Sequence, residues 1–268
     1  MDAAITIKQE RAWSGLALFS LGYRPFFLLG ALWAALAMGL WAAMLAGQLA
    51  LPTAFDPVSW HAHEFLFGYL AAIIAGFLLT AVPSWTGRPP LTGWPLASLA
   101  ALWMAGRVAI MFSQGLPPLV VALVDLAMMA ALAVLLTREI VAGGNWRNLP
   151  VVVLLVAFGA ANGLFHWEAA RGVYAAQGIG LRLGLAASLM MIAVIGGRIV
   201  PTFTRNWLVK RDEGRLCVRA AGRSGGCRGN SRAGDDRCRH LATCMDGWRA
   251  WVDDAGGHDA RNAGTQRA

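Results

Sequence analysis

Long apolar runs that are almost free of charge are the feature that most limits what this chain can fold into. Residues 26–47 and 65–82 contain no charged side chain at all. A helix that crosses the hydrocarbon core of a bilayer needs roughly 20 apolar residues. Lipid offers no hydrogen-bond partners to an open strand. These runs therefore predict helices that span a membrane.

Six such helices account for most of the chain before residue 202. The expected spans are residues 26–47, 60–82, 95–114, 116–137, 149–167 and 181–201. Pro83 and Pro201 are expected to end the second and sixth spans, because proline removes a backbone donor from a helix. The predicted fold class is an all-α membrane protein with about six transmembrane helices and an irregular C-terminal tail.

The distribution of charge divides the chain near residue 209. Residues 1–209 contain 11 Lys and Arg and 7 Asp and Glu, whereas residues 210–268 contain 12 and 8 in a much shorter length. The expected domains are a cytoplasmic N-terminal segment (1–25), a six-helix transmembrane domain (26–209) and a basic tail (210–268). The net charge of +8 is therefore not one basic surface.

The tail gives little sign of a folded or binding function. Its four cysteines match no spacing typical of zinc ligands; they are Cys217, Cys227, Cys238 and Cys244. Eight acidic residues are interspersed with the basic ones and no stacking aromatics repeat, so we expect no nucleic-acid partner. The tail is interpreted as disordered or as an out-of-frame translation.

Basic residues in the short loops predict the orientation of the spans. Most Lys and Arg lie before span one, after spans two and six, or between spans four and five. The opposite loops contain only Arg171 and Arg182. By the positive-inside rule, the N-terminus and the end of span six face the cytoplasm. We expect a multi-pass protein of a bacterial inner membrane, with the lipid bilayer as its main partner.

Three histidines of the membrane part are predicted at one membrane face. His61 and His63 open span two, and His166 closes span five, which runs in the opposite direction. Neutral imidazole is a common ligand of haem iron and copper, and Glu64 or Glu168 could orient such a ligand through its other ring nitrogen. His61 and His63 lie about 200° apart around a helix that includes both, so such a helix would not point them into one site. Either one of them lies in the preceding loop, or the two serve separate centres. The alternative is that these histidines cap helix ends beside an aromatic belt.

A second polar feature lies deeper in the predicted membrane. Arg107 in span three and Asp125 in span four are equidistant from the turn between them. An antiparallel hairpin places both side chains at the same depth, about 12–14 Å along the helices from the turn. A lone charge at that depth is costly, so we expect an intramembrane ion pair. Structural pairing and a role in a proton path or anion site are both open interpretations.

Four segments resemble the NnrS family. They are residues 22–29 (GYRPFFLL), 60–68 (WHAHEFLFG), 75–87 (AGFLLTAVPSWTG) and 197–206 (GRIVPTFTRN). The resemblance implies a polytopic bacterial membrane protein that contains haem and copper and is linked to denitrification, nitric oxide response and nitrosative stress. It carries His61, His63 and His166 over as cofactor and metal ligands, without assigning each to haem or copper. Nitric oxide is the implied ligand of the haem iron.

The chain departs from the family in one respect. Members of this family look like proteins of about twelve spans, whereas six are expected here. We therefore expect that a site built between two helical halves needs the missing second half or another chain. The first functional hypothesis is an NnrS-like haem and copper protein, either active or a truncated and inactive copy. The alternative is a small-solute transporter or half-transporter without a metal cofactor, using Arg107 and Asp125. Whether the chain is an enzyme is left open.

Overall fold

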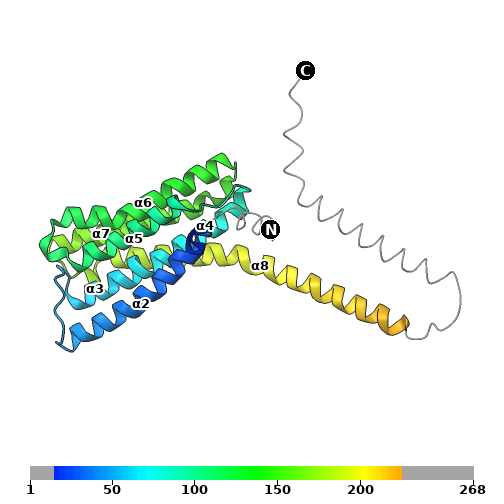
Figure 1. Ribbon diagram of the computed structural model, residues 1–268, viewed down its shortest axis with the longest axis horizontal. Helices are drawn as coiled ribbons and strands as arrows, with labels where there is room; N and C mark the ends of the chain where they lie inside the picture. The colour runs from blue at the N-terminus through cyan, green and yellow to red at the C-terminus, as the bar shows by residue number, and fades with distance from the viewer. Residues whose placement is uncertain (1–14, 225–268) are drawn as a thin grey trace, which may run out of the picture. The chain divides into compact units, whose positions relative to one another are not determined.

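The computed structural model describes residues 15–224, all of whose regular elements are helices. The membrane part consists of antiparallel helices packed side by side (Figure 1). In chain order its longer helices are α2 (Tyr23–Leu45), α3 (Pro57–His63), η2 (Glu64–Leu70), α4 (Ala71–Thr86), α5 (Trp94–Met111), α6 (Pro118–Ala142), α7 (Leu149–Ala170) and α8 (Ile179–Ser224). Short 3₁₀ turns lie at Ala17–Phe19, Ser113–Gly115, Trp146–Asn148 and Ala175–Gln177.

The prediction of six membrane-spanning helices is confirmed. Six stretches are long and apolar enough to cross a membrane: Tyr23–Leu45, Pro57–Thr86, Trp94–Met111, Pro118–Ala142, Trp146–Ala170 and Ile179–Gly197. Large apolar side chains such as Leu32, Leu123 and Leu189 are 60%, 59% and 65% exposed, which suits a lipid surround rather than water. The chain is therefore a multi-pass membrane protein.

The second span is the central one and is not a uniform α-helix. It consists of α3, the π-helical segment η2 and α4, and 56% of its most apolar stretch is buried, against 17% for α2. Asp56 caps its start, accepting hydrogen bonds from the backbone N–H groups of Val58 and Ser59 at 3.0 and 2.9 Å. The π-helical turns widen the helix at the level where the polar side chains lie.

The expectation that prolines end two spans was wrong. Helix α4 passes Pro83 and ends at Thr86, where Gly87 adopts a left-handed conformation (φ 68°). Proline removes only one helix hydrogen bond, so α4 continues past it, and the helix ends at the left-handed Gly87. Helix α8 likewise continues past Pro201.

Part of the segment expected to be an irregular tail is helical. Residues 210–224 belong to α8, and their Arg, Leu and Ala content favours helix once a preceding helix provides the first turn. The chain divides into two units between Thr202 and Phe203. Residues 1–14 and 225–268, including Cys227, Cys238 and Cys244, lie outside the described residues.

Hydrogen bonds between loops define the two ends of the helical bundle. At the first, Ser113 Oγ accepts from the Ala54 N–H at 2.8 Å and Ser59 Oγ accepts from the Ala176 N–H at 3.1 Å. We call this the histidine end; it comprises connections 46–56, 112–117 and 171–178. The arginine end comprises residues 15–22 and connections 87–93 and 143–148. There the Gly93 N–H donates to the Phe19 carbonyl at 2.8 Å, and Asn145 Nδ2 donates to the carbonyl of Trp85 near the end of α4.

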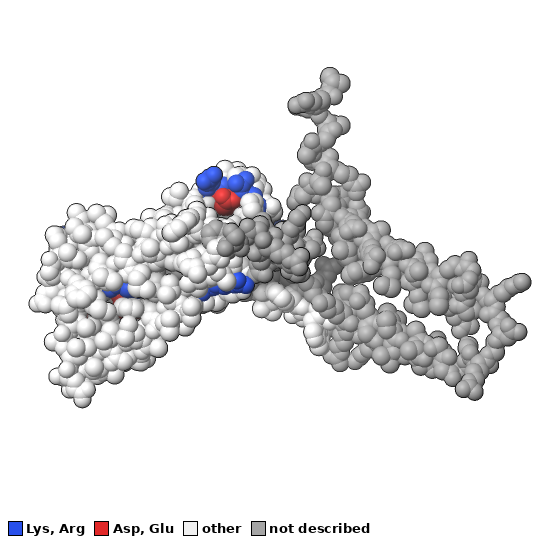
Figure 2. Space-filling view, in the orientation of Figure 1, with Lys and Arg blue, Asp and Glu red and all other residues white. Residues whose placement is uncertain are grey.

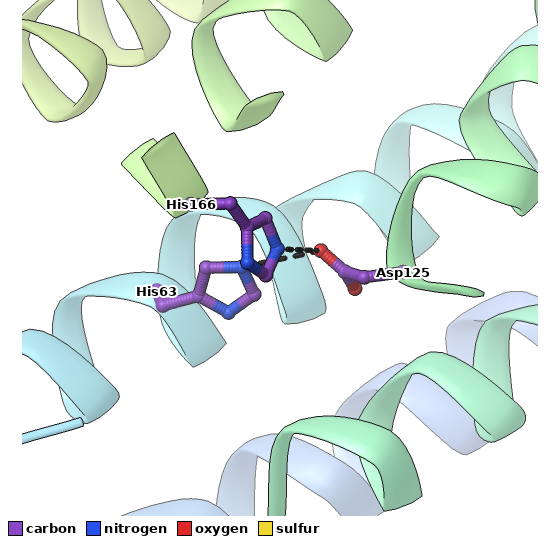
Figure 3. Close-up of side chains that lie close together, drawn as sticks. All are labelled: His63, Asp125 and His166. Atoms are coloured by element: carbon purple, nitrogen blue, oxygen red, sulfur yellow. Dashed lines mark hydrogen bonds and ion pairs between the residues drawn. The ribbon is translucent and has the colours of Figure 1, made fainter. Parts of the chain in front are cut away.

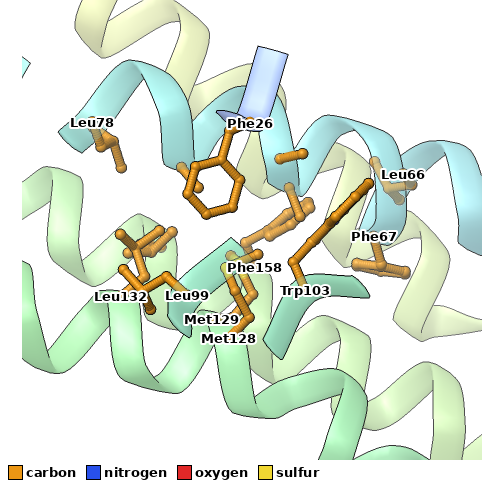
Figure 4. Packing of buried hydrophobic residues seen from close by; sticks show 14 of the residues in the cluster. Phe26, Leu66, Phe67, Leu78, Leu99, Trp103, Met128, Met129, Leu132 and Phe158 are labelled. Carbon is orange, nitrogen blue, oxygen red and sulfur yellow. The ribbon is translucent and has the colours of Figure 1, made fainter. Parts of the chain in front are cut away.

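Large apolar side chains fill the space between the helices (Figure 4). Phe26, Leu78, Leu132 and Phe158 are at most 1% exposed, and Trp103 is 2% exposed. Close approach of α8 to α7 depends on Gly180, where an added Cβ would lie 2.5 Å from the Phe165 backbone nitrogen. This tight packing encloses the polar residues described next.

Candidate metal centre

Seven polar side chains meet inside the membrane part, near the histidine end. We call this group the buried polar cluster; its members are Trp33 from α2, His63 from α3, Glu64 from η2, Arg107 from α5, Asp125 from α6, and Asn162 and His166 from α7. None of the seven is more than 7% exposed. Polar groups this deeply buried in a membrane protein are costly unless they satisfy one another.

Two histidines converge on one carboxylate oxygen. Asp125 Oδ2 lies 3.2 Å from His63 Nε2 and 3.1 Å from His166 Nε2 (Figure 3). One ligand atom from each of the three residues lies within 4.8 Å of the other two. Two imidazoles and a carboxylate are typical ligands of a transition-metal ion. Small movements of the side chains would bring all three donors to coordination distance of one ion.

Arg107 joins the two carboxylates of the cluster. Its Nη1 donates to both oxygens of Glu64 at 2.9 Å, and its Nη2 donates to Asp125 Oδ1. The Asp125 carboxylate is thereby divided: Oδ1 faces the guanidinium, while Oδ2 faces the histidines. The structure brings together the Arg107 and Asp125 side chains that sequence analysis paired, and adds Glu64 to them.

Both ring nitrogens of His63 face hydrogen-bond acceptors. Nδ1 lies 3.3 Å from Glu64 Oε1, and Nε2 lies 3.0 Å from Asn162 Oδ1 in addition to its contact with Asp125. A neutral imidazole has only one N–H, so one of these contacts requires a second proton or a metal ion. The hydrogen bond to Glu64 is of the kind that fixes a ligating histidine by its other nitrogen.

The remaining bonds hold the carboxylates in place. Trp33 Nε1 donates to Glu64 Oε2 at 2.6 Å, and Asn162 Nδ2 donates to Asp125 Oδ2 at 2.7 Å. With neutral histidines, two carboxylates face one guanidinium, which leaves the cluster one positive charge short. A bound cation, or a proton, would balance the charge.

The surroundings of His63 suit a single ion and do not suit a haem. Its ring centroid lies 5.3 to 5.8 Å from those of Phe55, Phe67 and Phe165, and 5.2 Å from that of His166. His63 is also 0% exposed, and both of its ring nitrogens already contact other side chains of the cluster. A haem iron could reach a nitrogen of His63 only if these contacts were broken and the buried polar cluster were opened.

His61 lies apart from the buried polar cluster. Its ring stacks on Trp41 with centroids 3.8 Å apart and an interplanar angle of 17°, and it also contacts Phe65 at 4.4 Å. The ring is partly exposed, and its buried Nδ1 has no hydrogen-bond partner among the described residues. His61 and His63 thus belong to different environments.

Glu168, expected to orient a histidine, lies elsewhere. Its oxygens accept from the backbone N–H groups of Ile179 and Gly180 at 2.7 and 3.1 Å, at the beginning of α8. This carboxylate satisfies free donors at a helix N-terminus, where negative charge is also favoured. Glu64 is the glutamate that contacts a histidine.

Sequence reasoning missed Trp33 and Asn162. Asn162 was visible as a lone amide within an apolar span, four residues before His166 and so on the same helix face. Trp33 gave no such signal, because tryptophan is common in apolar helices and at membrane interfaces.

The comparisons with known proteins identify a family. The family model described as NnrS protein matches residues 17–223. No curated protein and no solved structure matches the chain.

Proposed function

Since this chain belongs to the NnrS family, we propose that it is a haem- and copper-containing membrane protein that acts in the response to nitric oxide or in denitrification. The observation that carries the proposal is the convergence of His63, Asp125 and His166 inside the membrane part. We assign the copper ion to these three residues.

The electrostatics of the cluster support a resident cation. The two carboxylates exceed the single guanidinium by one negative charge, and His63 has acceptors at both ring nitrogens. Glu64 would hold His63 by Nδ1 and leave Nε2 as the ligand atom, while Arg107 would keep Asp125 Oδ1 away from the ion. The burial of all these groups would keep water away from an ion bound there.

We assign the haem to His61. It is the remaining histidine of the membrane part, its ring is only partly buried, and aromatic side chains lie against it. A haem held by His61 would supply an iron that can bind nitric oxide. Trp41 would fix the plane of the imidazole by stacking.

Metal analysis and an optical spectrum of the protein purified in detergent test both assignments. His63→Ala and His166→Ala should lose copper, with its content falling at least about tenfold, and should keep the Soret band. His61→Ala should lose the Soret band and keep copper. His61→Ala is therefore the matched control for the two copper-site variants, and they are the control for it. Gel filtration reports whether each variant is folded.

Other outcomes would contradict the proposal. Copper lost only in His61→Ala would move the ion away from the buried polar cluster. Folded wild-type protein that takes up neither haem nor copper would favour a metal-free transporter, in which the buried charges of Arg107, Glu64 and Asp125 serve a solute or a proton.

A further inference from the structure

A cavity at the arginine end lies far along the helices from the buried polar cluster. It has a volume of about 270 Å³ and lies between the end of α4, connection 87–93 and the end of α6. Its walls include Leu79, Val82 and Leu136, which are at most 5% exposed, and Pro90. The inner part of the cavity is therefore apolar.

Charged side chains lie at the rim of this cavity. Arg138 and Glu139 come from α6, and Arg88 donates through Nε to Glu139 Oε2. Arg138 is exposed, so its guanidinium can reach a ligand without first breaking a buried contact. In the space-filling view, basic side chains flank an acidic one at this end of the bundle (Figure 2). The rim is net positive.

Contacts between the end of α4 and the segment that follows α6 hold the walls of the cavity in place. Asn145 Nδ2 donates to the Trp85 carbonyl at 2.6 Å. At Gly143 an added Cβ would lie 2.8 Å from Thr86 Cβ, so the end of α6 packs directly on the end of α4. The cavity is thus part of the packed bundle and not a gap between loose loops.

The location of the cavity identifies the class of its ligand. It lies where membrane-spanning helices end, and Trp94 and Trp146 of the same end are 84% and 61% exposed. Exposed tryptophans at helix ends are typical of the level of lipid headgroups. A molecule at that level with an apolar chain and a negative headgroup matches an apolar wall with arginines at its rim.

We propose that this cavity binds one anionic phospholipid. Part of an acyl chain lies along Leu79, Val82 and Leu136, and the phosphate group lies at Arg138. Arg88 and Glu139 pair with each other beside it, so Arg138 carries the unbalanced positive charge of the rim. The proposal does not depend on haem, copper or nitric oxide.

Binding of phosphatidylglycerol to the full-length protein in detergent tests the proposal. Native mass spectrometry should show one tightly retained phosphatidylglycerol, and phosphatidylcholine should bind more weakly. Arg138→Gln should weaken phosphatidylglycerol binding about fivefold, because one arginine contact to the anionic headgroup is lost. Leu136→Trp, which fills the apolar part, should weaken it as well.

Arg171→Gln is the matched control. Arg171 is also exposed at a helix end, but it belongs to the histidine end and its guanidinium lies 4.4 Å from the Trp167 ring centroid. This variant should bind phosphatidylglycerol like the wild type. Equal losses in Arg138→Gln and Arg171→Gln, equal binding of the two lipids, or displacement of the lipid by inorganic phosphate alone would each overturn the proposal.

Discussion

Arg107 is the residue on which the buried polar cluster depends most. It is 1% exposed and neutralises carboxylates from two different helices, Glu64 and Asp125. Its position requires Gly68, because a Cβ there would lie 2.3 Å from Arg107 Nη1. The cluster is therefore specified by small residues around it as well as by its charged members.

Arg107→Met should strongly destabilise the protein, because it leaves two buried carboxylates without a cation. Breaking a buried ion pair by removing one partner costs about 3–5 kcal/mol. The double variant Arg107→Met with Asp125→Asn has one fewer negative charge and should recover part of this loss. Thermal unfolding in detergent measures both variants, and a double variant less stable than Arg107→Met would show that charge balance is not the reason.

The second span and α8 each make contacts that fix how the neighbouring helices pack. The π-helical segment η2 lies between His63 and α4, and Trp103 Nε1 donates to the Gly68 carbonyl within it at 2.9 Å. π-Helical turns expose carbonyls that a regular α-helix would engage, and they are frequent at functional sites. Here such a carbonyl joins α5 to the central span.

Gly180 and Gly196 in α8 offer a matched pair for testing helix packing. In a helix, Gly→Ala usually stabilises by about 0.5–1 kcal/mol. Gly196→Ala should do so, because nothing lies within 4 Å of the added Cβ. Gly180→Ala should instead lower the melting temperature, because its Cβ would clash with the Phe165 backbone. Equal shifts of both variants would rule out the close contact between α7 and α8.

The six spans could be predicted from the sequence, whereas the contacts between them could not. Apolar length predicts a span because lipid imposes it on each helix separately. The cluster combines side chains from five spans, among them His63, Arg107 and Asn162, and no local sequence pattern indicates which faces of different helices meet. The histidines and the deep ion pair were therefore treated as two features, although the structure joins them through Asp125 and Glu64.

Positive charge is distributed unevenly between the two ends of the helical bundle. The visible face of the described residues shows few charged side chains, as expected of a lipid-facing surface (Figure 2). At the arginine end lie Arg24, Arg88, Arg138 and Arg147, and at the histidine end lie Arg171 and Arg182. By the positive-inside rule, this asymmetry predicts that the arginine end faces the cytoplasm.

Labelling of single cysteines tests this orientation. With the four native cysteines replaced by serine, Gln48→Cys places a thiol at the histidine end and Trp146→Cys places one at the arginine end; both native residues are exposed. In intact spheroplasts a membrane-impermeant maleimide should label Gln48→Cys but label Trp146→Cys only after permeabilisation. The reverse pattern would place the arginine end outside. The buried polar cluster would then lie near the cytoplasmic face, and the copper ion proposed for it would have to be supplied from that side.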